Sequence, residues 1–282
     1  MTPPSTATGL TFSDVDQSGN DDFFVDYLDT VRSAPSIRQI DEKILEIVAA
    51  QHPGLIVEIG CGTGDLLATL SAVSNPPARG VGVEKSAALT EEACRRHRAR
   101  AHLDFIVHDF MEATESPQLA ARGLALGTAD ALVLNRVVQH LPEPVKLLGN
   151  ARPWLRPGGV AVISDVDWTQ LSIRHENTAL TGRILAEHVG YLANAKAGSV
   201  SGDLLAEAGF SEAKVSLAVT HEISEFGLAN KLFSLSFAVD RLVSKGELTA
   251  EAGSEWLLSC AQLEREGRFF ASVFQSVVFA VA

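Results

Sequence analysis

Residues 55–65 read L-I-V-E-I-G-C-G-T-G-D, and this stretch decides the fold of the chain. Its first five residues form an apolar run rich in β-branched side chains, which is typical of a strand buried on both faces of a parallel sheet. The run leads into Gly60, Gly62 and Gly64 and then into an apolar-periodic segment that predicts a helix. A strand that turns through glycines into a helix brings backbone N–H groups close to a ligand, because no Cβ blocks the approach.

The spacing of the glycines distinguishes between the ligands that use such a turn. A phosphate-binding P-loop needs a Lys after its last glycine, whereas Asp65 follows Gly64 here. A dinucleotide fingerprint, G-x-G-x-x-G, requires glycine at the position that Asp65 occupies. Glu58, two residues before the first glycine, would repel a pyrophosphate but attract an ammonium or sulfonium group. The turn therefore favours a cationic ligand, with an ordinary glycine-rich turn as the alternative that this motif alone leaves open.

Strand-like and helix-like segments alternate after the glycine turn. The expected strands are 55–59, 80–84, 103–108, 130–135 and 160–165, followed by 213–223 and 273–281. Repeated strand–helix units predict a doubly wound parallel sheet with right-handed crossovers. Ligands bind such sheets at the carboxyl ends of the strands, where this chain has Glu84, Asp109, Asn135 and Asp165.

The chain divides into four expected parts. Residues 1–20, rich in Thr, Ser, Pro and Gly, are expected to form a flexible N-terminal arm. Residues 21–52 carry two amphipathic helices that would either close over the ligand as a lid or pack on the sheet edge. Residues 53–170 would form the ligand-binding core. Residues 171–282 would form a helical cap that is interleaved with the last two strands of the sheet.

Composition limits the class of partner. The formal net charge of the 282 residues is −12, so the chain lacks the basic field that nucleic-acid binding requires. The three cysteines are widely spaced and suggest a reducing compartment. No apolar run reaches the roughly 18 residues of a membrane span. We expect a cytoplasmic protein, a monomer or homodimer, with no nucleic-acid or membrane partner.

Two acids at strand ends are suited to a nucleoside. Glu84 lies twenty positions after Gly64 (84 − 64 = 20), a spacing at which an acid accepts hydrogen bonds from both hydroxyls of a ribose. Asp109 and Phe110 follow the third strand and offer an acceptor for an exocyclic amine and a ring for stacking on adenine. In isolation, each acid could equally be a solvated charge at the end of a strand.

The motifs occur in a characteristic order: V-E-I-G-C-G-T-G-D, V-G-V-E, H-D-F, D-A-L-V-L-N-R-V-V-Q-H-L and L-R-P-G-G-V-A-V-I-S-D. Over about residues 55–165 this set resembles the class I S-adenosylmethionine-dependent methyltransferases. The resemblance is to the methyltransferase type 11 group, whose relatives include ubiquinone and menaquinone C-methyltransferases and many small-molecule methyltransferases. It implies a Rossmann-like α/β fold, with a mostly parallel seven-stranded sheet whose last strand is antiparallel, plus a helical cap. The implied cofactor is S-adenosylmethionine and the product S-adenosylhomocysteine.

The resemblance also implies which residues bind the cofactor. They are Glu58, Gly60, Cys61 and Gly62 at the methionine part, Glu84 with the adjacent Lys85 at the ribose, Asp109 and Phe110 at the adenine, and Asn135 beside the sulfonium. The carboxylate of the methionine part needs a cationic or hydroxyl partner. We expect Arg38 or Tyr27, from the N-terminal helices, to provide it.

The expected reaction is in-line methyl transfer to a small, largely apolar metabolite, such as those of secondary metabolism, at an O-, C- or N-acceptor. His140 is the candidate general base, although a His that bonds to backbone is the simpler interpretation. Candidate substrate-pocket residues are Asp167, Trp168, Tyr191 and Phe233, and no metal site is expected. The alternatives are a non-methylating enzyme of the same fold, catalysing a cyclisation or decarboxylation, and a non-catalytic binding module.

Overall fold

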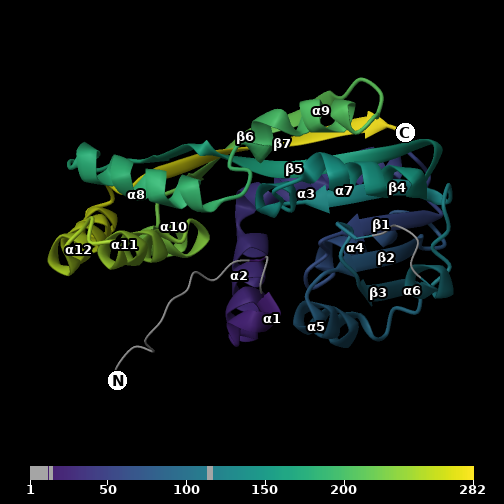
Figure 1. Ribbon diagram of the computed structural model, residues 1–282, viewed down its shortest axis with the longest axis horizontal. Coiled ribbons are helices and arrows are strands. Elements are labelled where there is room, and N and C mark those ends of the chain that lie inside the picture. Colours follow the sequence, from purple (N-terminus) through teal and green to yellow (C-terminus); the bar gives the residue numbers. More distant parts are fainter. Residues whose placement is uncertain (1–11, 13–14, 113–116) are drawn as a thin grey trace.

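A computed structural model of the chain describes residue 12 and residues 15–112 and 117–282. The strands are β1 (Leu55–Ile59), β2 (Arg79–Glu84), β3 (Leu103–Val107), β4 (Ala129–Asn135), β5 (Leu155–Ile173), β6 (Lys214–Ile223) and β7 (Ala271–Val281). They form one sheet in the order β3-β2-β1-β4-β5-β7-β6 (Figure 1). The glycine turn follows β1, which lies near the middle of the sheet.

The direction of the strands agrees with the sequence analysis. β1 pairs in parallel with β2 and β4, and the pairs β2–β3 and β4–β5 are also parallel. β7 runs antiparallel to both β5 and β6. All five residues of β1 are buried, which explains why its sequence is apolar apart from Glu58. The expected doubly wound, mostly parallel seven-stranded sheet with an antiparallel last strand is confirmed.

Helices cover both faces of the sheet. The helices are α1 (Val15–Ser18), α2 (Asp21–Ser33), α3 (Pro35–Ala49), α4 (Asp65–Ser71), α5 (Ala87–His97), α6 (Pro117–Ala121), α7 (Pro144–Ala151), α8 (Thr178–Tyr191), α9 (Ala197–Glu207), α10 (Phe226–Leu232), α11 (Leu235–Ser244) and α12 (Ala250–Arg265). Side chains alternate along β1, so that Ile56 joins the core under α3 and α4, while Val57 and Ile59 join the core under α7 and α9. The two cores leave the carboxyl ends of the strands open.

β5 differs from its expected bounds at both ends. The strand begins at Leu155 rather than at residue 160, and Pro157, Gly158 and Gly159 form an irregularity within it, because β4 pairs with Leu155 and then with Val160. Beyond Asp165 the strand continues to Ile173, since Val166 and Trp168 keep an apolar face that packs in a further core. This extension carries the sheet out of the parallel core.

That further core belongs to the cap. Helices α8, α10, α11 and α12 pack on the extended ends of β5, β6 and β7 and form a separate lobe (Figure 1). Helices α10 and α11 follow one another closely, and Ser234 between them has φ +51°. Most of the apolar surface of the cap helices is buried within this lobe.

The N-terminal helices connect the two lobes. α3 buries Ile40 and Ile44 against the sheet, whereas α2 lies between the core and the cap (Figure 1). Tyr27 of α2 donates a hydrogen bond from its hydroxyl to the backbone oxygen of Leu232, at 3.2 Å. Most of residues 1–20, the expected flexible arm, lie outside the described residues; of the rest, Val15–Ser18 form α1.

Candidate active site

The glycine turn after β1 has the backbone that its sequence requires. Gly60 has φ +69° and Gly62 has φ +51°, which are left-handed conformations that favour glycine. The Gly60 N–H donates to the Val83 oxygen at 2.7 Å, which fixes the turn against β2. A Cβ at Gly60 would lie 2.5 Å from a methyl carbon of Val137. The turn is therefore closely packed against the loop that follows β4.

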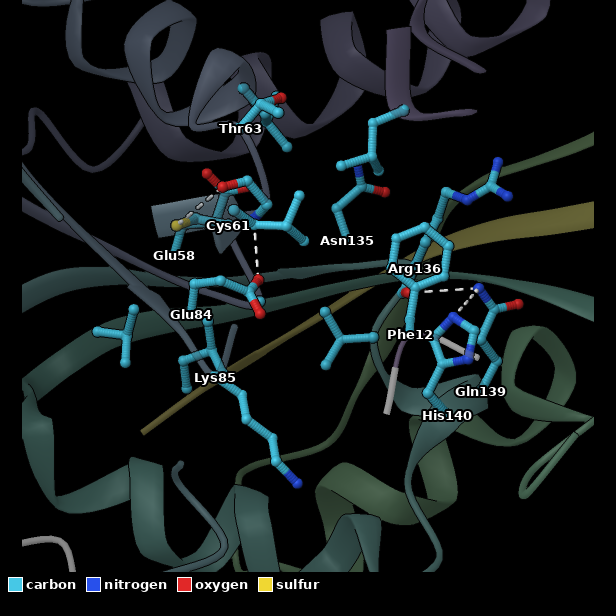
Figure 2. A pocket seen from close by; sticks show the side chains of 18 of the residues that line it. Phe12, Glu58, Cys61, Thr63, Glu84, Lys85, Asn135, Arg136, Gln139 and His140 are labelled. Atoms are coloured by element: carbon cyan, nitrogen blue, oxygen red, sulfur yellow. Dashed lines mark hydrogen bonds between the residues drawn. The ribbon is translucent and has the colours of Figure 1, made fainter. Parts of the chain in front are cut away.

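A cavity of about 550 Å³ opens beside this turn, and we call it the first cavity. It collects the ends of β1, β2, β3 and β4 together with side chains of α2 and α3. Its acidic, basic and histidine lining residues are Arg32, Asp41, Glu58, Asp65, Glu84, Lys85, His108, Asp109, Arg136 and His140. In Figure 2 Glu58, Cys61 and Glu84 lie on one side, and Phe12, Arg136, Gln139 and His140 on the other, with Asn135 between them.

The Glu84 carboxylate joins the turn after β1 to the turn after β2 at the first cavity. Its carboxylate accepts the N–H of Gly62 and the N–H of Ser86, both at 3.0 Å. Burial raises the pKa of Glu84, while these backbone hydrogen bonds act in the opposite direction. Each carboxylate oxygen has a further lone pair, so Glu84 keeps the capacity to accept from a ligand.

Glu58 is a buried acid with an unused acceptor. Its side chain is 3% exposed, and its Oε2 has no hydrogen-bond partner. Burial, and then the neighbouring charge of Asp41, raise the pKa of Glu58 well above its ordinary value. Arg32 of α2 lies 3.7 Å from a carboxylate oxygen of Asp41. A cation placed beside Glu58 would offset this desolvation, as the sequence analysis anticipates.

The expected adenine end of the first cavity combines polar and core residues. The Lys85 ammonium lies 3.3 Å from a carboxylate oxygen of Asp109. The Phe110 ring is 2% exposed and packs edge-on against Trp154, with 6.4 Å between ring centroids. Most of that ring therefore belongs to the core under the sheet, which leaves little of its face for stacking. Asn135, at the end of β4, has a buried Oδ1 without a partner.

Arg136 crosses the mouth of the first cavity towards α2. Its backbone has φ +62°, and its N–H donates to the Ser164 oxygen at 2.7 Å. Its guanidinium donates to the hydroxyl of Tyr27 at 3.1 Å. The Arg136 side chain thereby reaches α2, and its hydrogen bond fixes the position of the Tyr27 hydroxyl.

The hydrogen bonds of Gln139 define the state of His140. The indole N–H of Trp168 only donates, so its hydrogen bond to Oε1 fixes the orientation of the Gln139 amide. The amide nitrogen then donates to Nε2 of His140 at 3.2 Å, and the imidazole proton lies on Nδ1. Burial, and then the charge of Arg136, lower the pKa of His140 to about 4. His140 is neutral near pH 7, and its accepting nitrogen is already occupied.

A second cavity, of about 130 Å³, lies on the far side of the same residues, and we call it the second cavity. It shares Phe12, Tyr27, Gln139 and His140 with the first cavity. Its other lining residues are Phe23, Phe24, Trp168, His188, Tyr191, Leu192, Ala193, Leu232, Ser234, Phe237 and Arg241. They come from α2, β5 and the cap, so the second cavity joins the two lobes.

The profile of a protein family described as "Methyltransferase domain" matches residues 57–161. This range contains the glycine turn, Glu84, Asp109 and Asn135, which line the first cavity. Malonyl-[acyl-carrier protein] O-methyltransferase from Halalkalibacterium halodurans is 30% identical over 128 residues, 45% of this chain and 44% of that protein. The core is a class I S-adenosylmethionine-dependent methyltransferase domain.

Other comparisons extend beyond this domain. A protein of 37.1 kDa encoded in transposon Tn4556 of Streptomyces fradiae is 29% identical over 260 residues, 92% of this chain and 71% of that protein. The YcgJ protein of Bacillus subtilis shares the fold, with a TM-score of 0.54, 10% identity and coverage of 84% of this chain and 97% of that one. The malonyl-acyl-carrier-protein relative is matched over less than half of its length.

The cofactor of the methyltransferase is S-adenosylmethionine, and the first cavity fits it chemically. Its ammonium and sulfonium groups are cationic, and the first cavity offers the unpartnered Oε2 of Glu58 and Oδ1 of Asn135. The free acceptor capacity of Glu84 suits hydroxyl groups. A buried acceptor without a partner is costly, and a cationic ligand would satisfy these two atoms.

The structure brings most of the expected site residues together. The first cavity is lined by Tyr27, Glu58, Gly60, Cys61, Gly62, Glu84, Lys85, Asp109, Phe110, Asn135 and His140, and the second by Trp168 and Tyr191. Arg38 is exposed on α3 and lines neither cavity. Phe233 is buried behind Trp168, with ring centroids 5.7 Å apart. Asp167 is 3% exposed, lines neither cavity, and accepts hydrogen bonds from Thr169.

Several lining residues are absent from the sequence-based set. They are Arg32, Asp41, Arg136, Gln139, His188 and Arg241. Arg136 and Gln139 lie between Asn135 and His140 in the sequence. Their position between two expected site residues could have identified them as candidates. His188 and Arg241 come from α8 and α11, and nothing in their local sequence indicates that these helices meet over α2.

Other features of the described residues bear on the chemistry. Cys61, Cys94 and Cys260 are free thiols. In residues 12, 15–112 and 117–282, no group of three or more His, Cys, Asp or Glu side chains is placed to hold a metal ion. Within the same residues, no helix is long and apolar enough to cross a membrane.

Proposed function

We propose that this methyltransferase transfers a methyl group to a small, largely apolar acceptor, which binds in the second cavity and reaches the first. The observation that carries the proposal is the shared wall of the two cavities, formed by Phe12, Tyr27, Gln139 and His140. A methyl donor on one side and an acceptor on the other would meet at these residues. The aromatic lining of the second cavity supports an apolar acceptor.

In this proposal the cofactor occupies the first cavity with its cationic end near Glu58. Glu84 holds the ribose and Asp109 the adenine amine, as the resemblance implies. The sequence analysis expects Arg38 or Tyr27 beside the methionine carboxylate. Here Arg32 takes the place of Arg38, because Arg32 lines the first cavity beside Asp41, whereas Arg38 is exposed; Tyr27 also lines that cavity. The bound cofactor supplies a methyl group on a sulfonium, which an O, N, C or S nucleophile displaces in line.

The protein contributes position and exclusion of water. Tyr27 and Arg136 hold the boundary between the cavities by their hydrogen bond, and Gln139 orients His140 towards the same boundary. His140 would form part of the boundary between the cavities. Its imidazole is neutral, because its pKa is lowered to about 4. An acceptor whose nucleophile is already unprotonated near pH 7 needs no general base.

The named relatives do not determine the acceptor. Trans-aconitate 2-methyltransferase from Deinococcus radiodurans is 33% identical over 132 residues, 47% of this chain and 43% of that protein. Its name and that of the malonyl-acyl-carrier-protein enzyme specify different acceptors. Both alignments cover less than half of this chain. The similarity therefore does not assign the acceptor of either relative to this chain.

The test combines calorimetry with labelled methyl transfer. S-Adenosylmethionine and S-adenosylhomocysteine should both bind the purified chain with one-to-one stoichiometry. Incubation with methyl-labelled donor should label members of a panel of small aromatic and apolar metabolites, but not tRNA, DNA or a basic peptide. Strong labelling of a macromolecule with none of the small molecules would overturn the proposal.

A further inference from the structure

The lining of the second cavity is unusual for a protein with a formal net charge of −12. Among the described residues that line it there is no Asp or Glu. Arg241 is the only Lys or Arg among these described residues. The electrostatic character of the second cavity is therefore set by one guanidinium surrounded by aromatic side chains, and it favours an anionic ligand.

Arg241 has a donor that no protein group uses. Its Nε donates to a carboxylate oxygen of Glu187 at 3.0 Å, and its guanidinium carbon lies 4.3 Å from the centroid of the Tyr191 ring. Its Nη2 is buried and has no hydrogen-bond partner. Lys245 also contacts Glu187, at 2.6 Å, so two cations share one carboxylate and the group keeps a net positive charge.

His188 adds a second unused polar atom to the same wall. Its side chain is 6% exposed, and its Nε2 is buried without a partner. The ring packs edge-on against Trp168, with 4.8 Å between ring centroids. Burial, and then the charge of Arg241, lower the pKa of His188 to about 4, so the imidazole is neutral and can donate a hydrogen bond without adding charge.

We propose that the second cavity is a carboxylate-binding subsite, in which Nη2 of Arg241 and Nε2 of His188 bind the carboxylate of the methyl acceptor. This inference rests on the proposed function for the assignment of the second cavity to the acceptor. A guanidinium with a free N–H matches a carboxylate in charge and geometry. A cationic acceptor would be repelled by Arg241, which also occupies the Tyr191 ring that would otherwise bind a cation.

The size of the second cavity limits the acceptor further. Its volume of about 130 Å³ is close to that of a cavity that binds benzene, about 150 Å³. One ring or a branched chain of similar size fits between Arg241 and the shared wall. Because the methyl group comes from the first cavity, the reacting atom must lie at the opposite end of the acceptor from the carboxylate. The structure thus assigns a two-ended acceptor, with a carboxylate at one end and a nucleophile at the other.

The experiment compares isosteric probes that differ in charge. The full chain is saturated with S-adenosylhomocysteine and titrated by calorimetry with 4-hydroxybenzoate, benzoate and the corresponding neutral amides. Wild-type protein should bind the carboxylates about ten- to a hundredfold more tightly than the amides, which is the range expected for a charged hydrogen bond. In Arg241→Gln this preference should disappear, while the affinity for S-adenosylhomocysteine stays within about twofold.

Arg183→Gln is the matched control. Arg183 is exposed on α8 and donates to the backbone oxygen of Glu247, so this change removes the same charge from the same lobe without touching the second cavity. It should leave the preference intact. A second variant, His188→Phe, keeps a ring beside Trp168 but removes the polar atom, and it should weaken carboxylate binding less than Arg241→Gln does.

The outcomes separate the two proposals. Wild-type protein that binds the amides as tightly as the carboxylates, or that binds neither while binding S-adenosylhomocysteine, overturns the carboxylate subsite whatever the variants do. An equal loss in Arg183→Gln and Arg241→Gln also overturns it, because it would reflect general charge. Carboxylate binding that depends on Arg241 in a protein that binds no S-adenosylhomocysteine would support the subsite and refute the proposed function.

Discussion

The two cavities share four residues but differ in charge. Five acids line the first cavity together with three Lys or Arg side chains, whereas the second has Arg241 and, among its described lining residues, no acid. Two of the cations in the first cavity, Arg32 and Lys85, lie within 4 Å of its own acids. In the two proposals above, the four shared residues would separate a cationic ligand from an anionic one. Variants in one cavity should therefore leave binding in the other largely unchanged.

The largest effect is expected at the turn of the first cavity. In Gly60→Ala the new Cβ would lie 2.5 Å from a methyl carbon of Val137, at a backbone φ of +69°. The left-handed backbone alone costs about 1–2 kcal/mol, and displacement of the turn should lower S-adenosylhomocysteine affinity by more than about thirtyfold. Calorimetry measures the affinity and urea unfolding measures the stability.

The matched control is Gly149→Ala in helix α7, where a Cβ would meet no atom within 4 Å. It should leave affinity unchanged and raise the free energy of unfolding slightly, by about 0.5–1 kcal/mol. If Gly60→Ala binds S-adenosylhomocysteine like the wild type, the turn does not contact the cofactor.

Glu84→Ala should have the next largest effect. It removes a charged acceptor and leaves the N–H groups of Gly62 and Ser86 without their partner. We expect a ten- to a hundredfold loss of affinity for S-adenosylmethionine, from about 1.5–3 kcal/mol for a charged hydrogen bond. Carboxylate probes of the second cavity should bind within about twofold of wild type. Glu91→Ala, at an exposed position of α5, is the control; a loss below about twofold in Glu84→Ala would make Glu84 a structural acid.

Glu58 should make cofactor binding depend on pH. Burial raises its pKa, so the folded protein without ligand takes up a proton that the unfolded chain lacks at the same pH. Its stabilising contribution is thus complete at low pH and is lost as pH rises through the raised pKa. A cationic ligand favours the ionised carboxylate, so binding should release a proton and affinity should rise with pH, by up to about tenfold per unit.

The measurement is calorimetry of S-adenosylmethionine at several pH values, in buffers that differ in ionisation enthalpy. Glu58→Gln should remove the proton release and flatten the pH dependence, while binding of carboxylate probes in the second cavity remains as in wild type. Proton uptake on binding, or a pH dependence that survives in Glu58→Gln, would contradict the assignment of the cationic end to Glu58.

The smallest effect is expected at the shared wall. His140→Asn removes an imidazole that is neutral near pH 7 and whose Nε2 already accepts from Gln139. We expect kcat to fall by less than about tenfold, because a positioned general base typically contributes about a hundredfold or more. The assay is initial rates with labelled donor and an acceptor found in the panel. A fall of a thousandfold with unchanged binding would restore His140 as the base.

The sequence predicted the first cavity far better than the second. The turn of Gly60 and Gly62, the acid at Glu84 and the amide at Asn135 all lie where parallel strands end, and that position follows from the alternation of strands and helices. Local signals of this kind are fixed by neighbours in the chain. These local signals therefore do not depend on how distant segments pack.

The second cavity depends on contacts between distant segments. His188 and Arg241 stand 53 positions apart (241 − 188 = 53), and they reach Phe23 of α2 only through the packing of the cap. The sequence analysis also did not predict that β5 continues to Ile173. The mixture of polar and apolar residues at 166–173 is compatible with a strand and with a loop that lines a pocket. Phe110 lines the first cavity as expected, but the sequence did not indicate that most of its ring packs in the core beside Trp154.

The long strands β5 and β7 have a mechanical consequence. They pair from Val160 with Val281 to Ile173 with Ala271, with an irregularity between Asp167 and Ser172, so both lobes contribute to one strand pair. Across that irregularity β6 stays paired with β7 from Leu217 to Ile223, so a rigid swing of the cap would have to bend or break this strand pair. The contacts of α2 with the cap are side-chain contacts, such as Tyr27 with Leu232 and Asp26 with Lys231. We expect ligands to enter by displacement of the N-terminal helices, with the cap stationary throughout turnover.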